Sequence, residues 1–258
     1  VEQDHRYRDF WQTYYKMTAR KGVTEQLAKI DMRRRLSLIG TMMLHKGEVD
    51  GLICGTWSTP LTHLNYVNQV IGNRPGISTY AAMNGLLLPD RQVFLVDTHI
   101  NYDPTAEQLA EITVMAAEEM RRFGIQPKAA LLSHSNFGSS DQPSALKMRE
   151  TLGLVRKKAP WLEIDGEMHG DAALDGRSRS SQMPDTTLIG DANLLVLPNL
   201  DSANIAYNLL KTAAGGNIAI GPVLLGAAKP VHILTASTTV RRIVNMTALT
   251  VADASAVR

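Results

Sequence analysis

Short apolar runs alternate with longer segments of helical periodicity along most of the chain. Lys128–Leu132, Leu162–Gly166 and Asn193–Leu197 have the length and composition of strands. Apolar positions recur at helical spacing in Thr105–Phe123 and Ser144–Lys158, which predicts amphipathic helices. Strands that alternate with helices predict an α/β fold with mainly parallel sheets.

The N-terminal part of the chain favours helices. Tyr7–Arg20 is an aromatic-rich amphipathic segment with Gly22 as its stop, and Thr24 is placed to cap one helix that continues towards His45. The elements expected next are a strand at Asp50–Cys54, a helix from Pro60, a break at Gly72–Gly76 and strands at Ser78–Leu88 and Gln92–Asp97. The break is rich in glycine and proline, so it is the predicted domain boundary.

Residues 198–234 carry the most informative pattern. A strand stops at Pro198, and Asp201 or Ser202 caps a helix that ends at Gly215–Gly216. A strand, a polar loop and a helix N-terminus suit an anion such as phosphate, although ordinary connections share this order. The helix has apolar positions at Ile205, Leu209 and Leu210, and the run continues with the apolar segments Ile218–Leu225, interrupted by Gly221–Pro222, and Val231–Leu234.

Composition narrows the class of protein. The chain has 258 residues, 44% hydrophobic and 20% charged, with a net charge of +2, so nothing indicates a nucleic-acid partner. No apolar run approaches the roughly 20 residues of a membrane helix, and the polar N-terminus is unlike a signal peptide. The single cysteine, Cys54, fits a reducing cytoplasm; its apolar setting favours an inert thiol over a nucleophile.

A polar loop, Ser133–Ser140, follows the strand at Lys128–Leu132. Its hydroxyl and backbone N–H groups are suited to cradle phosphate, or to cap the helix that follows. Asp165, Glu167 and Asp171 superficially resemble a metal cluster, but the histidines lack metal-ligand spacing, so we predict no metal. The chain also lacks a G-x-G-x-x-G run, so NADP binding is expected outside it.

Several segments resemble one family in the same order along the chain. They are GEVDGLICGTWST (47–59), ALLSHSNFGSS (130–140), EIDGEMHGDAAL (163–174), PNLDSANIAYNLL and GPVLLGAAKPV. This set resembles the phosphate acetyltransferase/butyryltransferase family. One branch of the family is similar in further segments: the C-terminal phosphotransacetylase-like domain of bacterial NADP-dependent malic enzymes. These segments of the chain are HSNFGSS, RYRDFWQTYYKMTARKGVT and HILTASTTVRRIVNMTALT.

The resemblance implies two α/β domains with the fold of isocitrate and isopropylmalate dehydrogenases. The first would combine residues 1–72 and 223–258, and the second would be the inserted residues 73–222, with a ligand cleft between them. Family members have a strand and a helix before this point, so the chain is expected to be a fragment. The positions matched to the acetyl-CoA and phosphate cleft are Thr56, Ser58, Thr59, Ser133, Ser135, Asn136, Gly138, Ser139, Asp201, Asn204, Gly221, Pro222 and Thr235.

The chain departs from the family pattern where acyl transfer needs charge. Active members resemble L-S-R-G-x-S-x-x-D after the KPV turn, where the arginine holds the acyl phosphate and the aspartate is the base. Thr235 replaces that serine, Ala236 stands at the arginine and Arg242 at the aspartate. Phe137 and Thr18 likewise stand where active members have a lysine and an arginine. Because an arginine side chain cannot accept a proton, we predict no catalytic residue.

Three functions remain open at this point. The first is a regulatory acetyl-CoA-sensing and oligomerisation domain, a dimer or larger, of an NADP-dependent malic enzyme without acetyltransferase activity. NADP and Mg or Mn would then belong to a malic enzyme catalytic domain in the same chain, and Arg241 and Arg242 would contact CoA phosphates or form a solvated helix face. The second is an active phosphate acetyltransferase, and the third is an assembly module without a ligand.

Overall fold

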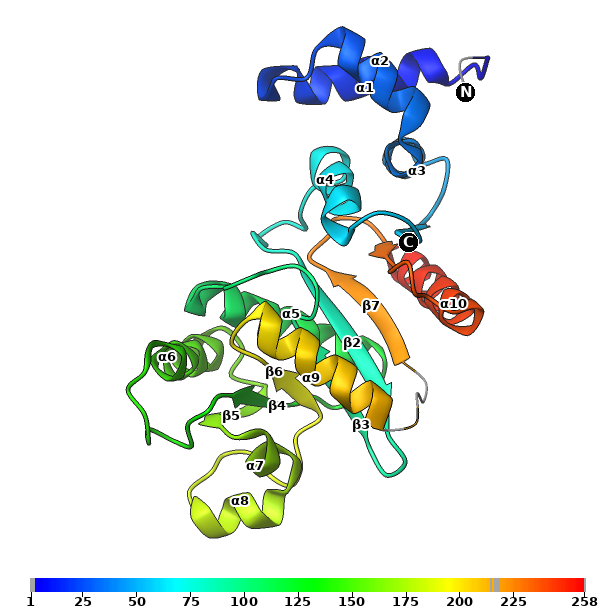
Figure 1. The fold of residues 1–258 in the computed structure, drawn as a ribbon. Coiled ribbons are helices and arrows are strands. Elements are labelled where there is room, and N and C mark those ends of the chain that lie inside the picture. Colours follow the sequence, from blue (N-terminus) through cyan, green and yellow to red (C-terminus); the bar gives the residue numbers. More distant parts are fainter. Residues whose placement is uncertain (1–2, 214, 216–218, 258) are drawn as a thin grey trace. The chain divides into compact units, whose positions relative to one another are not determined.

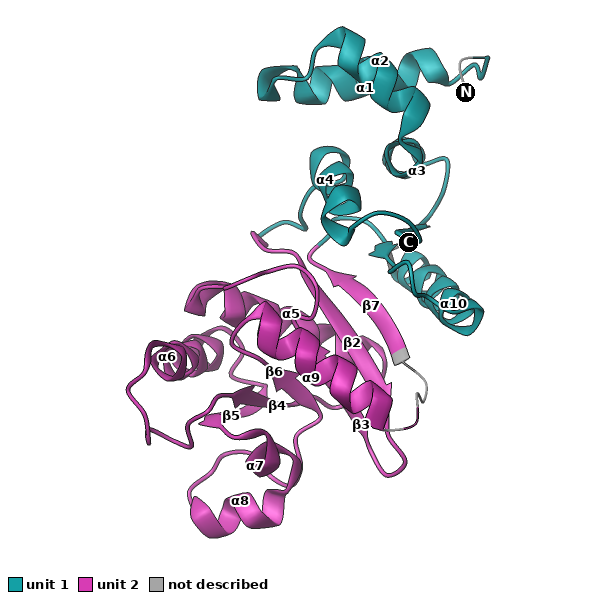
Figure 2. Cartoon of the chain, viewed as in Figure 1, with its two compact units in different colours: residues 1–76, 227–258 teal, residues 77–226 magenta. Residues whose placement is uncertain are grey.

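The computed structural model describes residues 3–213, 215 and 219–257, and it divides into two compact units. Unit 1 combines Val1–Gly76 with Ala227–Arg258, and unit 2 is Ile77–Gly226 (Figure 2). The boundaries expected from the sequence, after residues 72 and 222, each lie four residues earlier than these.

Unit 1 is mainly helical and contains a small two-stranded parallel sheet (Figure 1). Its two strands pair Leu52 with Val231 and Cys54 with Ile233. Its elements are α1 (Tyr7–Thr18), a short 3-10 helix (Ala19–Lys21), α2 (Glu25–Arg34), α3 (Leu36–Lys46), β1 (Leu52–Cys54), α4 (Pro60–Val70), β8 (Val231–Ile233) and α10 (Val240–Val257). Pro60 opens α4, as its fixed φ predicts.

The single helix expected from Thr24 towards His45 is wrong, because two helices form instead. Thr24 does cap α2, since its side chain accepts a hydrogen bond from the Leu27 N–H. Arg35 then leaves the helical region, with φ −106° and ψ 92°, and α3 starts after it. The bend lets Met32 of α2 and Leu38 of α3 enter one buried cluster, so packing overrides a sequence that contains no local helix breaker.

Unit 2 is built on a six-stranded sheet in the order β5-β4-β6-β3-β2-β7. Its strands are β2 (Ala81–Leu87), β3 (Gln92–Val96), β4 (Lys128–Leu132), β5 (Glu163–Met168), β6 (Leu194–Val196) and β7 (Ala219–Leu225). The pairs among β5, β4, β6 and β3 are parallel, while β2 is antiparallel to both β3 and β7. The predicted α/β fold with mainly parallel strands is confirmed.

Helices cover both faces of this sheet. The helices are α5 (Ala106–Arg122), α6 (Pro143–Lys158), α7 (Gly170–Leu174), α8 (Gly176–Gln182) and α9 (Leu200–Ala213). On β3, Val93 and Leu95 share a core cluster with Tyr207 of α9, whereas Phe94 meets Phe123 at the end of α5. Successive strand residues point to opposite faces, so α5 and α9 lie on opposite sides of the sheet.

The start and buried face of α9 differ from the sequence-based expectation. Asn199 caps the helix by accepting a hydrogen bond from the Ser202 N–H at 3.0 Å, so neither Asp201 nor Ser202 is the cap. Ala203 and Tyr207 are buried, while Ile205 and Leu209 are 58% and 65% exposed. Two apolar stripes lie on this helix, and periodicity alone does not say which one faces the core. Of the residues expected to end the helix and to begin the next apolar segment, Gly216 and Ile218 lie outside the described residues.

The expected interruption at Gly221–Pro222 is found in the pairing and not in the strand itself. β7 runs through both residues, while its register with β2 passes from Ile220 opposite Gly85 to Val223 opposite Met83. A Cβ atom at Gly221 would lie 2.7 Å from the Met83 carbonyl oxygen and 2.8 Å from Oδ1 of Asn84. Glycine therefore lets β7 pass close to β2, where the pairing register shifts between Met83 and Gly85. Separately, none of the described helices combines the length and apolar content that a membrane crossing needs.

Candidate functional site

In unit 1, two polar loops follow the carboxyl ends of neighbouring parallel strands. Loop 55–59 follows β1 and loop 235–239 follows β8. The Leu234 N–H donates to the Cys54 carbonyl at 2.7 Å, so the loops start side by side. The loops that carry Thr56, Ser58, Thr59 and Thr235 therefore begin at the same edge of the sheet, where ligand sites commonly lie.

Hydroxyl groups dominate these two loops. Ser58 and Thr59 each contact the Thr62 hydroxyl, at 3.2 and 3.0 Å, and Thr235 lies 3.2 Å from the Ser237 hydroxyl. Loop 55–59 leads into α4 and loop 235–239 into α10, and helix N-termini favour anions. Neither loop contains an acidic or a basic residue, so they offer hydrogen bonds but no general base and no fixed cation.

Cys54, at the end of β1, is suited to packing and not to nucleophilic chemistry. Burial raises the pKa of its thiol to about 11, against a reference of 9.0, and the nearby Ser37 side chain offsets only part of the shift. A thiolate is the reactive form, and the raised pKa keeps it scarce at neutral pH.

We therefore expect iodoacetamide to modify Cys54 of the folded chain about 100-fold more slowly at pH 8 than in the urea-unfolded chain, because two pKa units remove that much thiolate. The rate measured across pH should keep rising to about pH 11, where the folded thiol titrates. Equal rates in the two states would show that the thiol is exposed and reactive.

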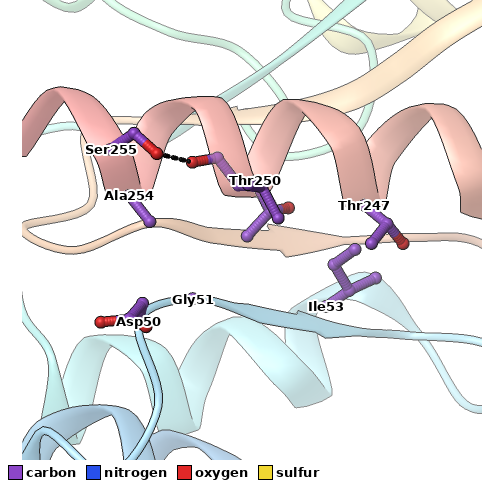
Figure 3. Close-up of a pocket in the computed structure, with 8 residues that line it drawn as sticks. Asp50, Gly51, Ile53, Thr247, Thr250, Ala254 and Ser255 are labelled. Atoms are coloured by element: carbon purple, nitrogen blue, oxygen red, sulfur yellow. Dashed lines mark hydrogen bonds between the residues drawn. The ribbon is translucent and has the colours of Figure 1, made fainter.

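A hollow of about 420 Å³ lies elsewhere in unit 1, between β1 and α10 (Figure 3). Asp50, Gly51 and Ile53 line one side, and Thr247, Thr250 and Ser255 are among the α10 residues on the other. None of the predicted ligand residues belongs to this lining, so the hollow and the two loops are separate features.

In unit 2, other predicted residues collect at the carboxyl edge of the parallel strands. The loop Ser133–Ser140 follows β4, and Asp201 and Asn204 lie at the start of α9, which follows the adjacent strand β6. Asn204 donates from Nδ2 to the Thr98 carbonyl at the end of β3, at 3.1 Å. Gly221–Pro222 is buried inside β7 and does not belong to a loop at this edge.

The serine loop is built around a buried carboxylate. Oε1 of Glu167 accepts from the Ser135 hydroxyl at 2.7 Å and from the Gly138 N–H at 3.0 Å, while the Asn136 N–H donates to the Ser139 hydroxyl. Ser135 and Glu167 are fully buried. Six of the N–H groups expected to cradle phosphate are therefore used within the loop or to β5, namely those of Ser133, Ser135, Asn136, Phe137, Gly138 and Ser139. The exposed residues of the loop are His134, Gly138 and Ser139.

The three acidic residues that resembled a metal cluster have separate partners. Asp165 accepts from Thr186 at 2.7 Å, Glu167 holds the serine loop, and Asp171 accepts from the Ala172 N–H at 2.9 Å. Among residues 3–213, 215 and 219–257, no three His, Cys, Asp or Glu side chains converge as metal ligands would.

Residues 1–251 match the sequence model of a family described as phosphate acetyl/butaryl transferase. The chain belongs to this family. Its phosphate acetyl/butaryl transferase region is 52% identical over 253 residues to the NADP-dependent malic enzyme of Escherichia coli K12, covering 98% of this chain and 33% of that protein. Identity to the phosphate acetyltransferase of Nitratidesulfovibrio vulgaris is 35% over 243 residues, 94% of this chain and 34% of that protein.

These matches confirm the family and the malic enzyme branch that the sequence motifs indicated. The chain spans about a third of the length of the curated relatives it matches. Among solved structures, the phosphotransacetylase from Streptococcus pyogenes superposes with a TM-score of 0.90 at 30% identity, over 98% of this chain and 77% of that one. The comparison with isocitrate and isopropylmalate dehydrogenases stays a prediction.

The positions at which this phosphate acetyl/butaryl transferase member departs from active relatives have clear structural settings. Ala236 is exposed in loop 235–239, so no cation is placed there. Arg242 lies in the first turn of α10, where its N–H donates to Thr239 Oγ1 at 3.4 Å. Phe137, at the lysine position, packs its ring partly against the unit 2 core. The methyl group of Ala236, the guanidinium of Arg242 and the phenyl ring of Phe137 cannot act as bases.

Proposed function

We propose that the chain is a regulatory, acetyl-CoA-sensing domain of an NADP-dependent malic enzyme and has no phosphotransacetylase activity of its own. The observation that supports it most is the uncharged chemistry of loops 55–59 and 235–239, which retain hydroxyl groups and helix N-termini. Such a surface binds by hydrogen bonds but does not remove the thiol proton of CoA or stabilise transferred charge. The 52% identity to a malic enzyme supports the parent assignment.

The ligand residues proposed in unit 1 are Thr56, Ser58, Thr59 and Thr235, and the support for them is that their two loops start from neighbouring parallel strands. Those in unit 2 are Ser133, Ser135, Asn136, Gly138, Ser139, Asp201, Asn204, Gly221 and Pro222. Within that set, the exposed Ser139, Gly138 and Asp201 are the most accessible to a ligand, whereas Ser135, Gly221 and Pro222 support the backbone. Acetyl-CoA would act as an effector through different affinities for two states of the parent protein.

The parent's cofactors are not assigned to these residues. The sequence has no dinucleotide-binding glycine run, and the described acidic side chains do not converge on a metal position. We propose that NADP and Mg or Mn bind the catalytic domain of the same chain, in the cytoplasm. We also propose a dimer or larger assembly, which the molecular mass in solution measures directly.

The alternative function is an active phosphate acetyltransferase, which the 35% identity to enzymes of that name favours. The test is the conversion of acetyl-CoA and phosphate to acetyl phosphate and CoA. The free thiol of the released CoA measures the rate. We expect turnover at least about 10⁴-fold below that of an active phosphate acetyltransferase assayed in parallel, because both base and charge stabilisation are missing. Turnover comparable to that enzyme would replace the regulatory assignment with the catalytic one.

A further inference from the structure

A buried histidine joins two parts of unit 1 that the motifs did not connect. His63 lies in the first turn of α4 and is 1% exposed. Its Nδ1 lies 2.6 Å from the hydroxyl of Ser37 on α3, and its Nε2 contacts the backbone carbonyl of Trp57. Trp57 belongs to loop 55–59, so this side chain links the loop to the helical core.

The chemistry of the partners fixes the direction of these hydrogen bonds. A carbonyl oxygen only accepts, so the ring hydrogen is on Nε2 and His63 donates to Trp57. In the neutral imidazole Nδ1 is then an acceptor, and the Ser37 hydroxyl donates to it. The Trp57 carbonyl therefore sets the tautomer, and the Ser37 hydroxyl supports it by donating to Nδ1.

Besides His63, loop 55–59 is held at this point by the Thr62 hydroxyl, which lies 3.2 Å from the Ser58 hydroxyl and 3.0 Å from that of Thr59. Ser58 has a φ of 63°, a left-handed conformation that residues with side chains disfavour. Thr59, the residue before α4, makes no side-chain cap. The indole of Trp57 meets the imidazole edge-on, with ring centroids 5.1 Å apart and an interplanar angle of 82°. His63 thus contacts the loop through both backbone and ring, next to its strained residue.

We propose that His63 and Ser37 are positioning residues that hold loop 55–59 in its ligand-binding conformation and thereby set the affinity for an acyl-CoA. The inference rests on the proposed function, because that loop supplies Thr56, Ser58 and Thr59. Neither positioning residue needs to touch the ligand. A site held ready in this way binds more tightly, because less loop freedom is lost on binding.

The first test compares dissociation constants for acetyl-CoA in variants of the 258-residue chain. His63→Phe removes both hydrogen bonds while it fills the space, and we expect it to weaken binding about tenfold or more, as loss of a buried donor to an ordered loop would. Ser37→Ala should weaken binding in the same direction, and His63→Gln, which keeps a donor for the Trp57 carbonyl, should recover part of the affinity.

Thr41→Val is the matched control. Thr41 is also buried on α3, and its hydroxyl donates to the Leu38 carbonyl of its own helix at 2.9 Å. This variant loses a comparable hydroxyl, so it should lower stability while the dissociation constant stays within about twofold of the parent. If folded His63→Phe or Ser37→Ala bound acetyl-CoA as tightly as Thr41→Val, the positioning role would be overturned.

A second readout does not need the ligand. With Trp11→Phe and Trp161→Phe in the background, fluorescence reports on Trp57 alone, since the chain has three tryptophans. We expect His63→Phe and Ser37→Ala to change acrylamide quenching of Trp57, and Thr41→Val to leave it unchanged. Absence of acetyl-CoA binding in the parent chain would defeat the proposed function, and unchanged quenching in both His63→Phe and Ser37→Ala would overturn the positioning role.

Discussion

Gly55→Ala is expected to abolish high-affinity ligand binding by unit 1 and to lower the free energy of unfolding by about 2–5 kcal/mol. Gly55 has a φ of 100°, and a Cβ atom there would lie 2.4 Å from the Leu234 carbonyl oxygen and 2.8 Å from the Leu234 nitrogen. Those atoms belong to backbone, so a methyl group must push the two loops apart. Urea unfolding and acetyl-CoA titration of the same preparation measure the two effects.

Gly72→Ala provides the control for backbone strain alone. Gly72 also lies in unit 1 and has a φ of 77°, but nothing lies within 4 Å of a Cβ atom built there. We expect it to cost about 1–2 kcal/mol, from the left-handed backbone, and to leave acetyl-CoA binding unchanged. Equal losses of stability and binding in the two variants would contradict the close approach of loops 55–59 and 235–239.

Arg179→Met is expected to lower the free energy of unfolding by about 3–5 kcal/mol, because it leaves several buried carbonyl groups without a hydrogen-bond donor. Arg179 is fully buried and donates to the Ala172 carbonyl at 2.8 Å, to the Leu188 carbonyl at 2.7 Å and to the Gly190 carbonyl. The guanidinium thus ties α7 and α8 to the segment before β6. Methionine fills part of the volume but donates no hydrogen bond.

Arg177→Met is the matched change, two residues earlier on α8. The Arg177 side chain is exposed. The Arg177 backbone N–H donates to the capping carboxylate of Asp175, and the substitution keeps that N–H. We expect this variant to stay within about 0.5 kcal/mol of the parent in urea unfolding. A loss below about 1 kcal/mol for Arg179→Met would show that water or a shifted segment satisfies the carbonyls.

The sequence predicted the elements whose signals are local. Lys128–Leu132 forms β4 over the predicted residues, and Thr24 and Pro60 act at helix starts as their chemistry requires. The bend at Arg35 was missed because tertiary packing of Met32 and Leu38 causes it. The helices α7 and α8 were not predicted in the polar stretch Asp171–Ser181. The buried side chain that holds α8 in place is the charged Arg179, and the backbone carbonyls that accept its hydrogen bonds cannot be read from the sequence.

The candidate site was predicted in part. Strand order explains why the loops of Thr56 and Thr235 start at one edge of the sheet although they lie far apart in the chain, since β1 and β8 are parallel neighbours. The motifs gave those residues through family resemblance and not through spacing. Ser37 and His63 were missed, because only the packing of α3 against α4 brings them together. In the sequence Glu167 resembled a metal ligand, but in the structure its carboxylate accepts hydrogen bonds that hold the serine loop.

The most direct test of the regulatory assignment is calorimetric titration of the 258-residue chain with acetyl-CoA in phosphate buffer, with free CoA titrated for comparison. We expect saturable binding of acetyl-CoA, weaker binding of free CoA, and acetyl-CoA recovered intact at the end of the titration. No saturable heat at millimolar acetyl-CoA, or its conversion to acetyl phosphate during the titration, would contradict the assignment.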